Sequence, residues 1–553
     1  MTKPTDTMEK IVALCRRRGF IFGSSEIYGG IGGFWDYGPL GCELKKNIKD
    51  AWWHDMVRNP PPGPGGTEYQ MVGLDCSIIM NPKVWEASGH VGGFADPMRK
   101  CPGCGHFVRA DQLWETLATA SPWLDSLLQV FTPGTGQYDS PRLMKWAKTK
   151  GKKLAPNLAL VRNPEVTLVW LATRVEGQPA APPTMQEFTQ YIATEQLHQT
   201  GLQEPCPRCG APLGPPAPFK LMFETHTGVE QNEKSNVYLR PETAQGIFVN
   251  FRNVLDSTRV KIPFGIAQIG KAFRNEITPR NYTFRSREFE QMEIEFFCHP
   301  ESSMEWYEFW RDVRIKWYES LNIKSEKLRP RQQGKEELAH YSAACTDIEY
   351  LFPFSDEPQE LEGVAHRGDF DLKAHGKSAR GDENAFAVID DDPSRRLQPA
   401  RTPGEPGPSA RFVPHVIEPS AGVDRFALAA ITEAYTFDEG RASPEFMKFH
   451  PRLAPIKAAV FPLVAKDGLP EIAEPIYREI AKHFPCQYDA KQSIGKRYAR
   501  MDEAGTPFCF TIDGRTKEDG TVTVRDRDDA SQERISADPN VILRFLNDKL
   551  GLH

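Results

Sequence analysis

The sequence predicts an α+β protein: a domain built on an antiparallel sheet, an insertion stapled by zinc, and a C-terminal α/β domain. Three observations predict this fold class. Acidic and apolar residues alternate through the strand-like segment 288–297, which is typical of a sheet with one polar face. Two Cys-x-x-Cys pairs enclose residues 105–205. After His450, short apolar strands alternate with helical patterns.

Length and composition bound the kind of molecule. The 553 residues suggest three or four domains, which we place at 1–100, 101–215, 216–449 and 450–553. With 68 Lys and Arg against 74 Asp and Glu, the net charge of −6 excludes a uniformly basic nucleic-acid coat but not local basic grooves. No apolar run approaches the ~18–20 residues of a membrane span, and the N-terminus lacks a signal-peptide pattern, so we expect no membrane partner. The 11 cysteines favour a reduced, cytoplasmic protein with one metal site over a disulfide framework.

The N-terminal elements follow from periodicity and from glycine and proline. Apolar residues at helical spacing predict a helix over 8–19. A glycine-rich stretch at 29–33 separates it from a second helix over 40–58. Pro39 stands directly before this second helix, where its missing N–H costs little. The run PPPGPGG at 60–66 predicts a loop.

The cysteine pairs indicate a structural metal site. Cys101 and Cys104 form one pair, Cys206 and Cys209 the other, and the two-residue spacer lets both thiolates of a pair reach one ion. Together they would complete a tetrahedral four-cysteine zinc site with no open position, which would staple the two ends of the insertion. Unmetallated or redox-active thiols are the alternative, and His106 could replace one thiolate.

The interior of the insertion predicts a folded subdomain. It combines helical stretches over 111–130 and 184–199 with a β-prone segment at Val166–Leu171. Its large apolar side chains would supply a core: Trp114, Leu124, Leu127, Trp146 and Trp170.

The segment 273–297 is the most informative in the chain. It predicts two antiparallel strands joined by a loop. Strand alternation places Arg274 and Glu276 on one face, and it places Glu293 and Glu295 together on the return strand. A face that carries arginines and carboxylates is costly to bury unless it binds a ligand with both charges. A solvent-exposed hairpin with cross-strand ion pairs is the alternative.

Another segment, further along the chain, favours a ligand-binding face over an exposed hairpin. Residues 413–418 predict a strand, and 419–425 predict a turn that enters a helix over 426–434. An arginine at the start of a helix opposes the helix dipole, and this placement is easier to understand if Arg425 binds a phosphate. A local ion pair between Arg425 and Asp424 is the alternative.

The remaining elements complete the chain. Residues 392–411 are dense in proline, glycine, serine and arginine, and predict a mobile surface loop. In the last domain we expect strands over 455–463 and 506–513, and helices over 470–483 and 538–550.

Together these motifs carry a resemblance to a known family. The chain resembles the class II aminoacyl-tRNA synthetases, and among them the homodimeric type of glycyl-tRNA synthetase. The helix after Pro39 is similar to the first class motif, which forms the dimer interface. The stretch from FRNE to RSREF at 273–289 is similar to the second motif, and EPSAGVDRF at 418–426 to the third. Further stretches match the family: YGPLG at 37–41, RPETAQG at 240–246, EELAHY at 336–341, DIEY at 347–350, DFDL at 369–372, GTPFC at 505–509 and TVRDRD at 523–528.

This resemblance implies a class II synthetase-like catalytic domain and a C-terminal anticodon-binding domain. It implies ATP-dependent attachment of glycine to tRNA(Gly) in two steps. Glycyl-adenylate forms with release of pyrophosphate, and glycine then passes to the 3′-terminal adenosine of the tRNA. Such chemistry needs positioning and stabilisation of phosphate charge rather than a protein nucleophile. The implied cofactors and partners are ATP, Mg²⁺, structural Zn²⁺, glycine, tRNA(Gly) and a second copy of the chain.

The resemblance also implies an ATP site. Arg274 would contact the α-phosphate, Glu276 the adenine amino group, and Phe289 the face of the adenine ring. Arg285 and Arg425 would hold the β- and γ-phosphates, which makes Arg274 and Arg425 the expected catalytic residues. The other residues expected around ATP are Asn275, Phe284, Leu361, Gly422, Val423 and Asp424, with Glu360 and Glu418 as candidate Mg²⁺ ligands.

Glycine offers only an ammonium and a carboxylate, so its pocket must select by excluding a side chain. The pocket should also be acidic around the ammonium. By the family pattern, Glu242, Glu290, Glu293 and Ser420 would line it, and Arg109 would reach the carboxylate. Zinc would help to place Arg109, which lies five residues after Cys104. An ion pair of Glu242 with Arg240 is the alternative. The rest of the expected pocket is Phe289, Gln291, Met292, Glu418 and Gly422.

Two basic groups are candidates for tRNA contacts, and a solvated surface is the alternative for both. In the last domain, basic residues near Tyr498 would meet single-stranded bases, which stack and expose their edges: Lys496, Arg497, Arg500, Arg525 and Arg527. In the insertion, a lysine cluster could approach the acceptor stem: Lys145, Lys148, Lys150, Lys152 and Lys153.

Two other function classes compete with the ligase. A non-catalytic relative that binds nucleic acid would have lost phosphate-binding arginines, whereas Arg274, Arg285 and Arg425 are all present. A zinc-stapled interaction protein without chemistry leaves the ordered acid and arginine motifs unexplained. Glycine-dependent exchange of pyrophosphate into ATP separates the three.

Overall fold

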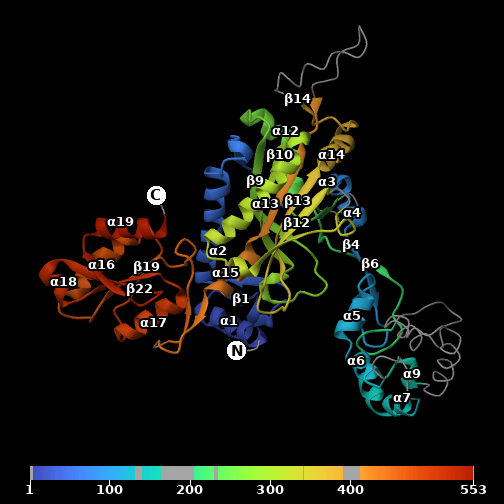
Figure 1. Ribbon diagram of the computed structural model, residues 1–553, viewed down its shortest axis with the longest axis horizontal. Helices are drawn as coiled ribbons and strands as arrows, with labels where there is room; N and C mark the ends of the chain where they lie inside the picture. Colours follow the sequence, from blue (N-terminus) through green and yellow to red (C-terminus); the bar gives the residue numbers. More distant parts are fainter. Residues whose placement is uncertain are drawn as a thin grey trace, which may run out of the picture. The chain divides into compact units, whose positions relative to one another are not determined.

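Figure 1 shows the computed structural model of the chain. It describes residues 4–130, 140–162, 205–229, 235–339, 342–389, 411–441 and 443–551. The segments predicted at 166–171, 184–199 and 392–411 lie outside the described residues, except for Arg411. The chain divides into two compact units, a large unit of residues 1–91 and 222–553 and an insertion unit of residues 92–221.

The large unit is built on a seven-stranded sheet (Figure 1). The strands follow the order β11-β12-β13-β16-β10-β9-β3, and all neighbours are antiparallel except β3 and β9. The predicted antiparallel sheet is therefore confirmed. The bounds are β3 Gln70–Gly73, β9 Phe264–Phe273, β10 Glu288–Cys298, β11 Leu328–Gln332, β12 Ala344–Tyr350, β13 Gln359–Gly368 and β16 His415–Gly422.

Strand β10 shows how the sequence gives this sheet two different faces. Met292 and Ile294 are buried in a core that they share with helix α13 (Ser303–Ser320). Because successive side chains of a strand point to opposite faces, Glu293 and Glu295 lie on the other side. The acidic residues predicted to share a face do share one.

Helices cover both faces of the sheet. On the apolar face, α2 (Pro39–Trp53) and α15 (Val423–Ala434) share the core with α13. On the other face, α12 (Ala244–Thr258) and α14 (Phe370–Arg380) pack with the Phe297 end of β10. Glu293 and Glu295 lie nearer the Glu288 end of β10 and are not part of this second core.

The N-terminal helices agree with the sequence pattern. α1 spans Pro4–Arg18, and Pro39 is the first helical residue of α2. The predicted helix over 40–58 is α-helical to Trp53 and continues as a short π-helical turn over His54–Arg58. Shorter elements complete this region: β1 (Ile21–Gly23), η1 (Glu26–Tyr28), β2 (Trp35–Tyr37), η3 (Pro64–Gly66), α3 (Pro82–Ala87) and α4 (His90–Gly93).

The insertion unit has a three-stranded sheet in which β4 (Ala95–Lys100) lies between β5 (Phe107–Arg109) and β6 (Ala217–Lys220). The strand that enters the unit is thus paired with the strand that leaves it. The predicted helix over 111–130 is two helices, because Ser121 caps a new helix that begins with proline. The helices are α5 (Leu113–Ala120), α6 (Pro122–Leu128), α7 (Ser140–Trp146), η4 (Ala147–Gly151), α8 (Lys152–Leu154) and α9 (Ala159–Arg162).

This unit has its own hydrophobic core. Of the apolar residues predicted to form it, Leu124, Leu127 and Trp146 are buried in one cluster with Cys101, Cys206 and Cys209. Trp170 and the side chain of Trp114 lie outside the described parts of the chain.

The C-terminal residues form a second sheet, in the order β20-β19-β21-β22-β23. β19 pairs in parallel with β20 and β21, and the remaining pairs are antiparallel. The four elements predicted here are present, with five further ones between them. The bounds are β19 Ala458–Pro462, α16 Leu469–Ile480, β20 Cys486–Tyr488, α17 Ile494–Ala504, β21 Phe508–Ile512, α18 Gly514–Asp519, β22 Thr521–Asp526, β23 Gln532–Ser536 and α19 Pro539–Leu550.

Two local predictions are wrong. Residues 419–422 are not a turn: they continue β16, because this central strand finds partners in both β13 and β10. Helix α15 accordingly starts at Val423. The first strand of the predicted hairpin ends at Phe273, so Arg274 and Glu276 lie in the loop that follows.

Short elements make up the rest of the large unit: β7 (Glu224–His226), β8 (Asn236–Tyr238), η6 (Tyr282–Phe284), η7 (Pro300–Ser302), η8 (Ser325–Lys327), β14 (Val388–Ile389), β15 (Arg411–Phe412), β17 (Tyr435–Phe437) and β18 (Glu445–Met447). Among the described residues, no helix combines the length and the apolar character needed to cross a membrane.

Candidate active site

A cavity of about 420 Å³ opens on the polar face of the seven-stranded sheet. Side chains from β10, β13 and β16 line it, together with the loop before β10 and the start of α15. Arg274, Arg285 and Arg425 all line this one cavity, although they lie far apart in the sequence. The arrangement is what the binding of one triphosphate by three arginines requires.

One end of the cavity is a buried cluster of carboxylates around a single arginine. Arg367, 2% exposed, donates to Glu418 at 2.7 Å and to Asp371 at 2.8 and 2.9 Å. Carboxylate oxygens of Glu293, Glu295 and Glu418 lie within 4.8 Å of one another. One guanidinium cannot balance four ionised carboxylates, so the cluster must either hold protons or take up a further cation.

The carboxyls of this cluster differ in pKa. Burial and the neighbouring carboxylates raise the pKa of Glu418 to about 8, and they also raise the pKa of Glu293 and Glu295. Burial acts in the same direction on Glu242, but its partners, led by the His90 ring 3.5 Å from its Oε2, outweigh burial and hold its pKa well below the ordinary value. Glu242 is therefore the carboxylate that stays ionised at neutral pH.

Glu242 is not paired with Arg240. The Arg240 guanidinium donates instead to the backbone carbonyls of Lys271 at 2.7 Å and Cys76 at 2.8 Å. Glu242 accepts a hydrogen bond from Gln245 at 3.0 Å and faces the cavity. The ion-pair alternative for Glu242 is thus wrong.

The other end of the cavity carries arginines and aromatic rings. The guanidinium carbon of Arg274 lies 5.4 Å from the centre of the Phe289 ring, and its Nε donates to the carbonyl of Pro241 at 3.0 Å. Arg285 donates to Glu276 at 2.7 Å. A flat ring face beside guanidinium groups suits a base that is attached to phosphates.

Arg425 lies in the first turn of α15 and reaches across the wall of the cavity. Its Nη1 donates to the carbonyl of Glu360 at 3.0 Å and pairs with the carboxylate of the same residue at 3.1 Å. Its guanidinium also lies over the Phe284 ring, 4.7 Å from the centre. The charge of Arg425 lowers the pKa of Glu360. The local pair with Asp424 is not formed, because the Asp424 carboxylate is engaged elsewhere.

Asp424 belongs to a separate buried network. Its Oδ1 accepts hydrogen bonds from the Tyr37 hydroxyl at 2.7 Å and from Lys45 at 2.9 Å, and its Oδ2 accepts one from the backbone N–H of Glu290 at 2.8 Å. Lys45 and Lys49 also pair with the Glu290 carboxylate at 3.1 and 3.0 Å. Burial opposes ionisation of Asp424, but these partners lower its pKa. Asp424 also lines the cavity, with its carboxylate engaged in these contacts, and its contact with ATP stays a prediction.

Four residues of the large unit that were expected in the site are not among those that line the cavity. Glu290 and Met292 alternate with Gln291 along β10 and therefore face the other side of the sheet, where Met292 is buried in the core. Val423 is buried in the same core, and Asn275 is not among the described residues that line the cavity. The remaining expected residues of the large unit do line it: Glu242, Arg274, Glu276, Phe284, Arg285, Phe289, Gln291, Glu293, Glu360, Leu361, Glu418, Ser420, Gly422, Asp424 and Arg425.

Three further residues shape the site although no sequence prediction named them. Arg367 stands just before the DFDL stretch, and its i,i+4 spacing to Asp371 is a signal that could have indicated it. Thr243, next to Glu242 in RPETAQG, donates to Glu293. No sequence signal pointed to Lys45, because its partners come from two distant motifs.

Arg109 lies in the insertion unit, at the end of β5. Its guanidinium pairs there with Asp96 at 3.1 Å and with Asp111 at 2.7 Å. Its contact with the glycine carboxylate stays a prediction.

The four cysteines of the insertion unit form one cluster. The sulfur atoms of Cys101 and Cys209 are 3.6 Å apart, those of Cys104 and Cys206 are 3.7 Å apart, and all four lie within 4.8 Å of one another. A tetrahedron with Zn–S bonds of about 2.3 Å has edges of about 3.8 Å. The cluster fits a Zn²⁺ ion.

The two cysteine pairs share one backbone turn. The N–H of Cys101 donates to the carbonyl of His106 at 2.7 Å, and the N–H of Cys206 donates to that of Ala211 at 2.8 Å. Each second cysteine is followed by a glycine with φ of 72°, a left-handed conformation that other residues adopt at a cost. The metal-capable cluster consists of the four cysteines, without the His106 ring.

Most of the basic residues proposed for the anticodon surface are internal. Arg497, Arg525 and Arg527 are buried, and their guanidinium groups donate to backbone carbonyls or, for Arg525, to Asp502 at 2.8 and 2.9 Å. These arginines hold the domain together, so their assignment to a tRNA surface is corrected. Lys496 and Arg500 remain as exposed or half-exposed candidates.

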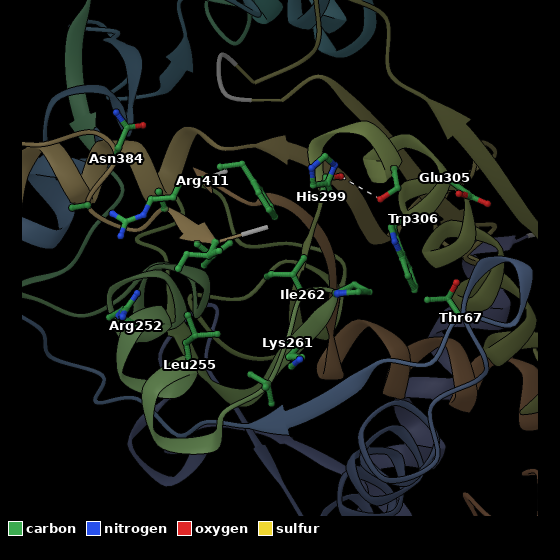
Figure 2. A pocket seen from close by; sticks show the side chains of 18 of the residues that line it. Thr67, Arg252, Leu255, Lys261, Ile262, His299, Glu305, Trp306, Asn384 and Arg411 are labelled. Carbon is green, nitrogen blue, oxygen red and sulfur yellow. Dashed lines mark hydrogen bonds between the residues drawn. The ribbon is translucent and has the colours of Figure 1, made fainter. Parts of the chain in front are cut away.

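A second cavity, of about 800 Å³, lies near the start of β9 and the end of β10. Figure 2 shows its surroundings, including Arg252, Lys261, Arg411 and Trp306. None of the residues expected in the active site is among the described residues that line it. Size alone does not identify the reactive cavity.

Two family models match the chain. The model described as the tRNA synthetase class II core domain (G, H, P, S and T) matches residues 227–435, and the anticodon binding domain matches residues 457–541. The first match contains all the arginines and carboxylates that line the 420 Å³ cavity, and the second contains all five strands of the C-terminal sheet.

Curated relatives match almost the whole chain. It is 46% identical to the glycine–tRNA ligase of Rhodopirellula baltica, over 96% of this chain and 97% of the relative. It is 44% identical to the glycine–tRNA ligase of Ruminiclostridium cellulolyticum, over 96% of each. Among solved structures, a prolyl-tRNA synthetase from Cryptosporidium parvum, complexed with L-proline and AMP, aligns with a TM-score of 0.52 and 11% identity over 98% of this chain and 75% of that one. At that identity the likeness concerns the fold alone.

Proposed function

Because the chain belongs to the family of the glycine–tRNA ligases, we propose that its 420 Å³ cavity is the site where glycine reacts with ATP. The chain attaches glycine to tRNA(Gly) at the expense of ATP. In the first step an oxygen of the glycine carboxylate bonds to the α-phosphorus, and pyrophosphate leaves. In the second step glycine passes to the 3′-terminal adenosine of the tRNA. The protein must orient the reactants and balance the phosphate charge.

The acidic end of the cavity would bind the glycine ammonium. Glu242 supports this role because its low pKa keeps it ionised. Glu293, Glu418 and Ser420 would complete the surroundings of the ammonium. The ammonium would bring the positive charge that the carboxylates around Arg367 lack.

Selectivity for glycine would come from crowding. Ser420 lies between Glu293 of β10 and Gly363 of β13 in the sheet register, and Gln291 donates to its hydroxyl at 3.2 Å. A larger amino acid would have to displace side chains that are fixed in this way, because spare room discriminates poorly. Arg109 is our candidate for the glycine carboxylate.

The arginine end would bind ATP. Phe289 would stack on the adenine, and Glu276 would accept a hydrogen bond from its amino group. Arg274 would hold the α-phosphate, and Arg285 and Arg425 the β- and γ-phosphates. The pair between Arg285 and Glu276 would open on binding, because phosphate oxygens compete strongly for a guanidinium.

Glu360 is our candidate ligand for Mg²⁺. Its carboxylate is positioned at the cavity by Arg425, and it would become available when Arg425 turns to the phosphates. The ion would neutralise phosphate charge during the reaction. Glu418 fits this role less well, because Arg367 already holds it at the acidic end.

We extend the proposal to features beyond the cavity. Structural Zn²⁺ in the four-cysteine cluster is supported by the sulfur–sulfur distances. A homodimer with α2 at its interface is supported by the likeness of this helix to the first class motif. Action in the cytoplasm is supported by the 11 cysteines, none of which forms a disulfide in the described chain. The C-terminal domain would bind the anticodon.

The convergence of Arg274, Arg285 and Arg425 beside an acidic cluster carries this proposal. Exchange of labelled pyrophosphate into ATP tests it: we expect exchange with glycine, and none with alanine or without an amino acid. Glycine-dependent exchange that persists unchanged in the double variant Arg274→Ala, Arg425→Ala would show that the reaction takes place elsewhere.

A further inference from the structure

We propose that Lys45 is a positioning residue for adenylate formation: through Asp424 it fixes both the start of α15, which carries Arg425, and the start of β10, which carries Phe289. This inference rests on the proposed function, because it assigns a task to a residue that touches neither glycine nor ATP. Lys45 lies on α2, beneath the sheet, and the side chains of the active-site cavity lie above it.

The geometry around Lys45 is that of a buried ionic hub. Lys45 is 9% exposed, and its ammonium lies 2.9 Å from Asp424 Oδ1 and 3.1 Å from Glu290 Oε2. The Tyr37 hydroxyl donates to the same Oδ1 at 2.7 Å, and the centre of the Tyr37 ring lies 4.4 Å from the ammonium. Tyr37, at the end of β2, and Lys45, on α2, thus both bind the Asp424 carboxylate.

Asp424 connects Lys45 to two parts of the proposed ATP site, the start of β10 and the start of α15. Its second oxygen, Oδ2, accepts the backbone N–H of Glu290 at 2.8 Å. Glu290 follows Phe289 directly, and Asp424 precedes Arg425 directly. One carboxylate therefore fixes the backbone next to the residue proposed to stack on adenine and the backbone next to the residue proposed to hold phosphate.

Charge explains why a lysine is needed at this position. Asp424 is in the first turn of α15, where its negative charge suits the helix dipole and offsets the unfavourable charge of Arg425. A buried carboxylate without a cationic partner would be neutralised or would turn toward solvent or toward Arg425. Lys45 prevents this, and so it leaves the Arg425 guanidinium directed at the cavity.

Helix α2 supplies its own control series of lysines. Lys45 pairs with both Asp424 and Glu290, and Lys49 pairs with Glu290 alone among the contacts described. Lys46 pairs only with Asp50 on its own helix among the same contacts, with both side chains 64% exposed. The three residues allow the hold on Asp424 to be separated from general effects of charge on this helix.

The experiment uses the full-length protein and glycine-dependent exchange of pyrophosphate into ATP, with the variants K45M, K49M and K46M. We expect K45M to raise the KM for ATP about tenfold, equivalent to about 1.4 kcal/mol, while the KM for glycine changes less than about twofold. K49M should have a smaller effect, and K46M none. K45R, which restores the charge, should recover part of the loss. A loss of stability alone would lower the active fraction and leave both KM values unchanged.

The outcomes are separable from those of the proposed function. Wild-type protein without glycine-dependent exchange refutes the function itself. Active wild-type protein with an unchanged ATP KM in folded K45M refutes the role of Lys45, as does an equal rise of both KM values. If K45M does not fold, Y37F removes a single neutral donor to Asp424. A rise of about threefold in the ATP KM of Y37F then supports the proposal, and no rise overturns it.

Discussion

Glu242 and Glu418 lie at the same end of the cavity, yet their carboxyls differ in charge. Glu242 is ionised at neutral pH because its partners, His90 above all, outweigh the effect of burial on its pKa. Burial and nearby carboxylates raise the pKa of Glu418 to about 8, so much of its population carries a proton. The glycine ammonium would therefore meet the ionised carboxylate of Glu242 and the carboxyl of Glu418, which must first release its proton.

Glycine should bind more tightly as the pH rises toward about 8.5. The ammonium favours the ionised form of Glu418, so below a pKa of about 8 each binding event must release a proton. We expect the KM for glycine to fall about tenfold between about pH 6.5 and about 8.5, and the KM for ATP to change little. Calorimetry in two buffers of different ionisation heat should detect the released proton. A flat KM for glycine would contradict the prediction.

Arg425→Ala should lower the rate of pyrophosphate exchange ~100-fold or more, because a positioned cation opposite the phosphates is lost. Arg425→Lys should recover only part of the rate, since a lysine cannot reproduce the planar, forked donor set. Steady-state exchange kinetics measure both. Arg478→Ala is the matched control, because this exposed arginine pairs with Glu474 on its own helix. An equal loss in Arg478→Ala would point to an effect of net charge instead.

At the scale of single elements, α13 shows how a polar pair is held inside the core. Arg314 and Glu362, 0% and 1% exposed, are joined at 2.7 Å, and Tyr318 donates to the same carboxylate at 2.6 Å. The Arg314 guanidinium also lies over the Trp317 ring, 4.4 Å from the centre. The pair joins α13 to β13 on the apolar face of the sheet, and β13 is also the strand that carries Glu360 and Arg367.

Arg314→Leu should destabilise the protein by about 3–5 kcal/mol, because it leaves the Glu362 carboxylate buried without a cation. Denaturant titration measures this loss. Arg311→Leu, on the exposed side of the same helix, should change stability by less than about 0.5 kcal/mol. A double replacement of Arg314 and Glu362 by leucine should be less damaging than Arg314→Leu alone. A double variant as unstable as the single one would contradict this account.

Cys104→Ser should remove zinc from the insertion unit and raise the KM for glycine, because β5 and Arg109 follow directly after this knuckle. Metal analysis should show about one zinc per wild-type chain and a strongly reduced content in the variant. Cys486→Ser, in the C-terminal domain, is the control for loss of a thiol. Loss of zinc with an unchanged KM for glycine would show that the metal site does not affect glycine binding.

The sequence was most informative where structure depends on near neighbours. The two faces of β10 follow from alternation, and the start of α2 follows from Pro39. Features set by distant partners were not predictable. Residues 419–422 extend β16 because strands on both sides pair with them. Arg527 is internal because its acceptors, such as the Phe449 carbonyl, come from a segment far along the chain.

At the scale of the whole molecule, the two reaction steps depend on different surfaces. In the proposed function, adenylate formation uses the cavity of the large unit, whereas transfer also needs tRNA. Of the basic residues proposed for the anticodon, Lys496 and Arg500 keep access to solvent. Only such residues can lose a tRNA contact without loss of internal structure.

The double variant Lys496→Ala, Arg500→Ala should raise the KM for tRNA in aminoacylation and leave pyrophosphate exchange unchanged. Basic side chains that contact phosphates should also flatten the salt dependence of tRNA binding when they are removed. Arg515→Ala is the matched control, since this exposed residue of α18 pairs with Asp519. If charging is unaffected at all salt concentrations, these two residues do not contact tRNA.

The pairing of β4 with β6 has a consequence for how this chain could have been assembled. Ala95 lies opposite Lys220 and Met98 opposite Ala217, so the departing and returning backbones run side by side as one ladder. A tight reverse turn joining these two strands would close the same ladder without the residues between them. The residues between β4 and β6 could therefore be lengthened, exchanged or deleted in evolution while the paired strands on either side kept their register.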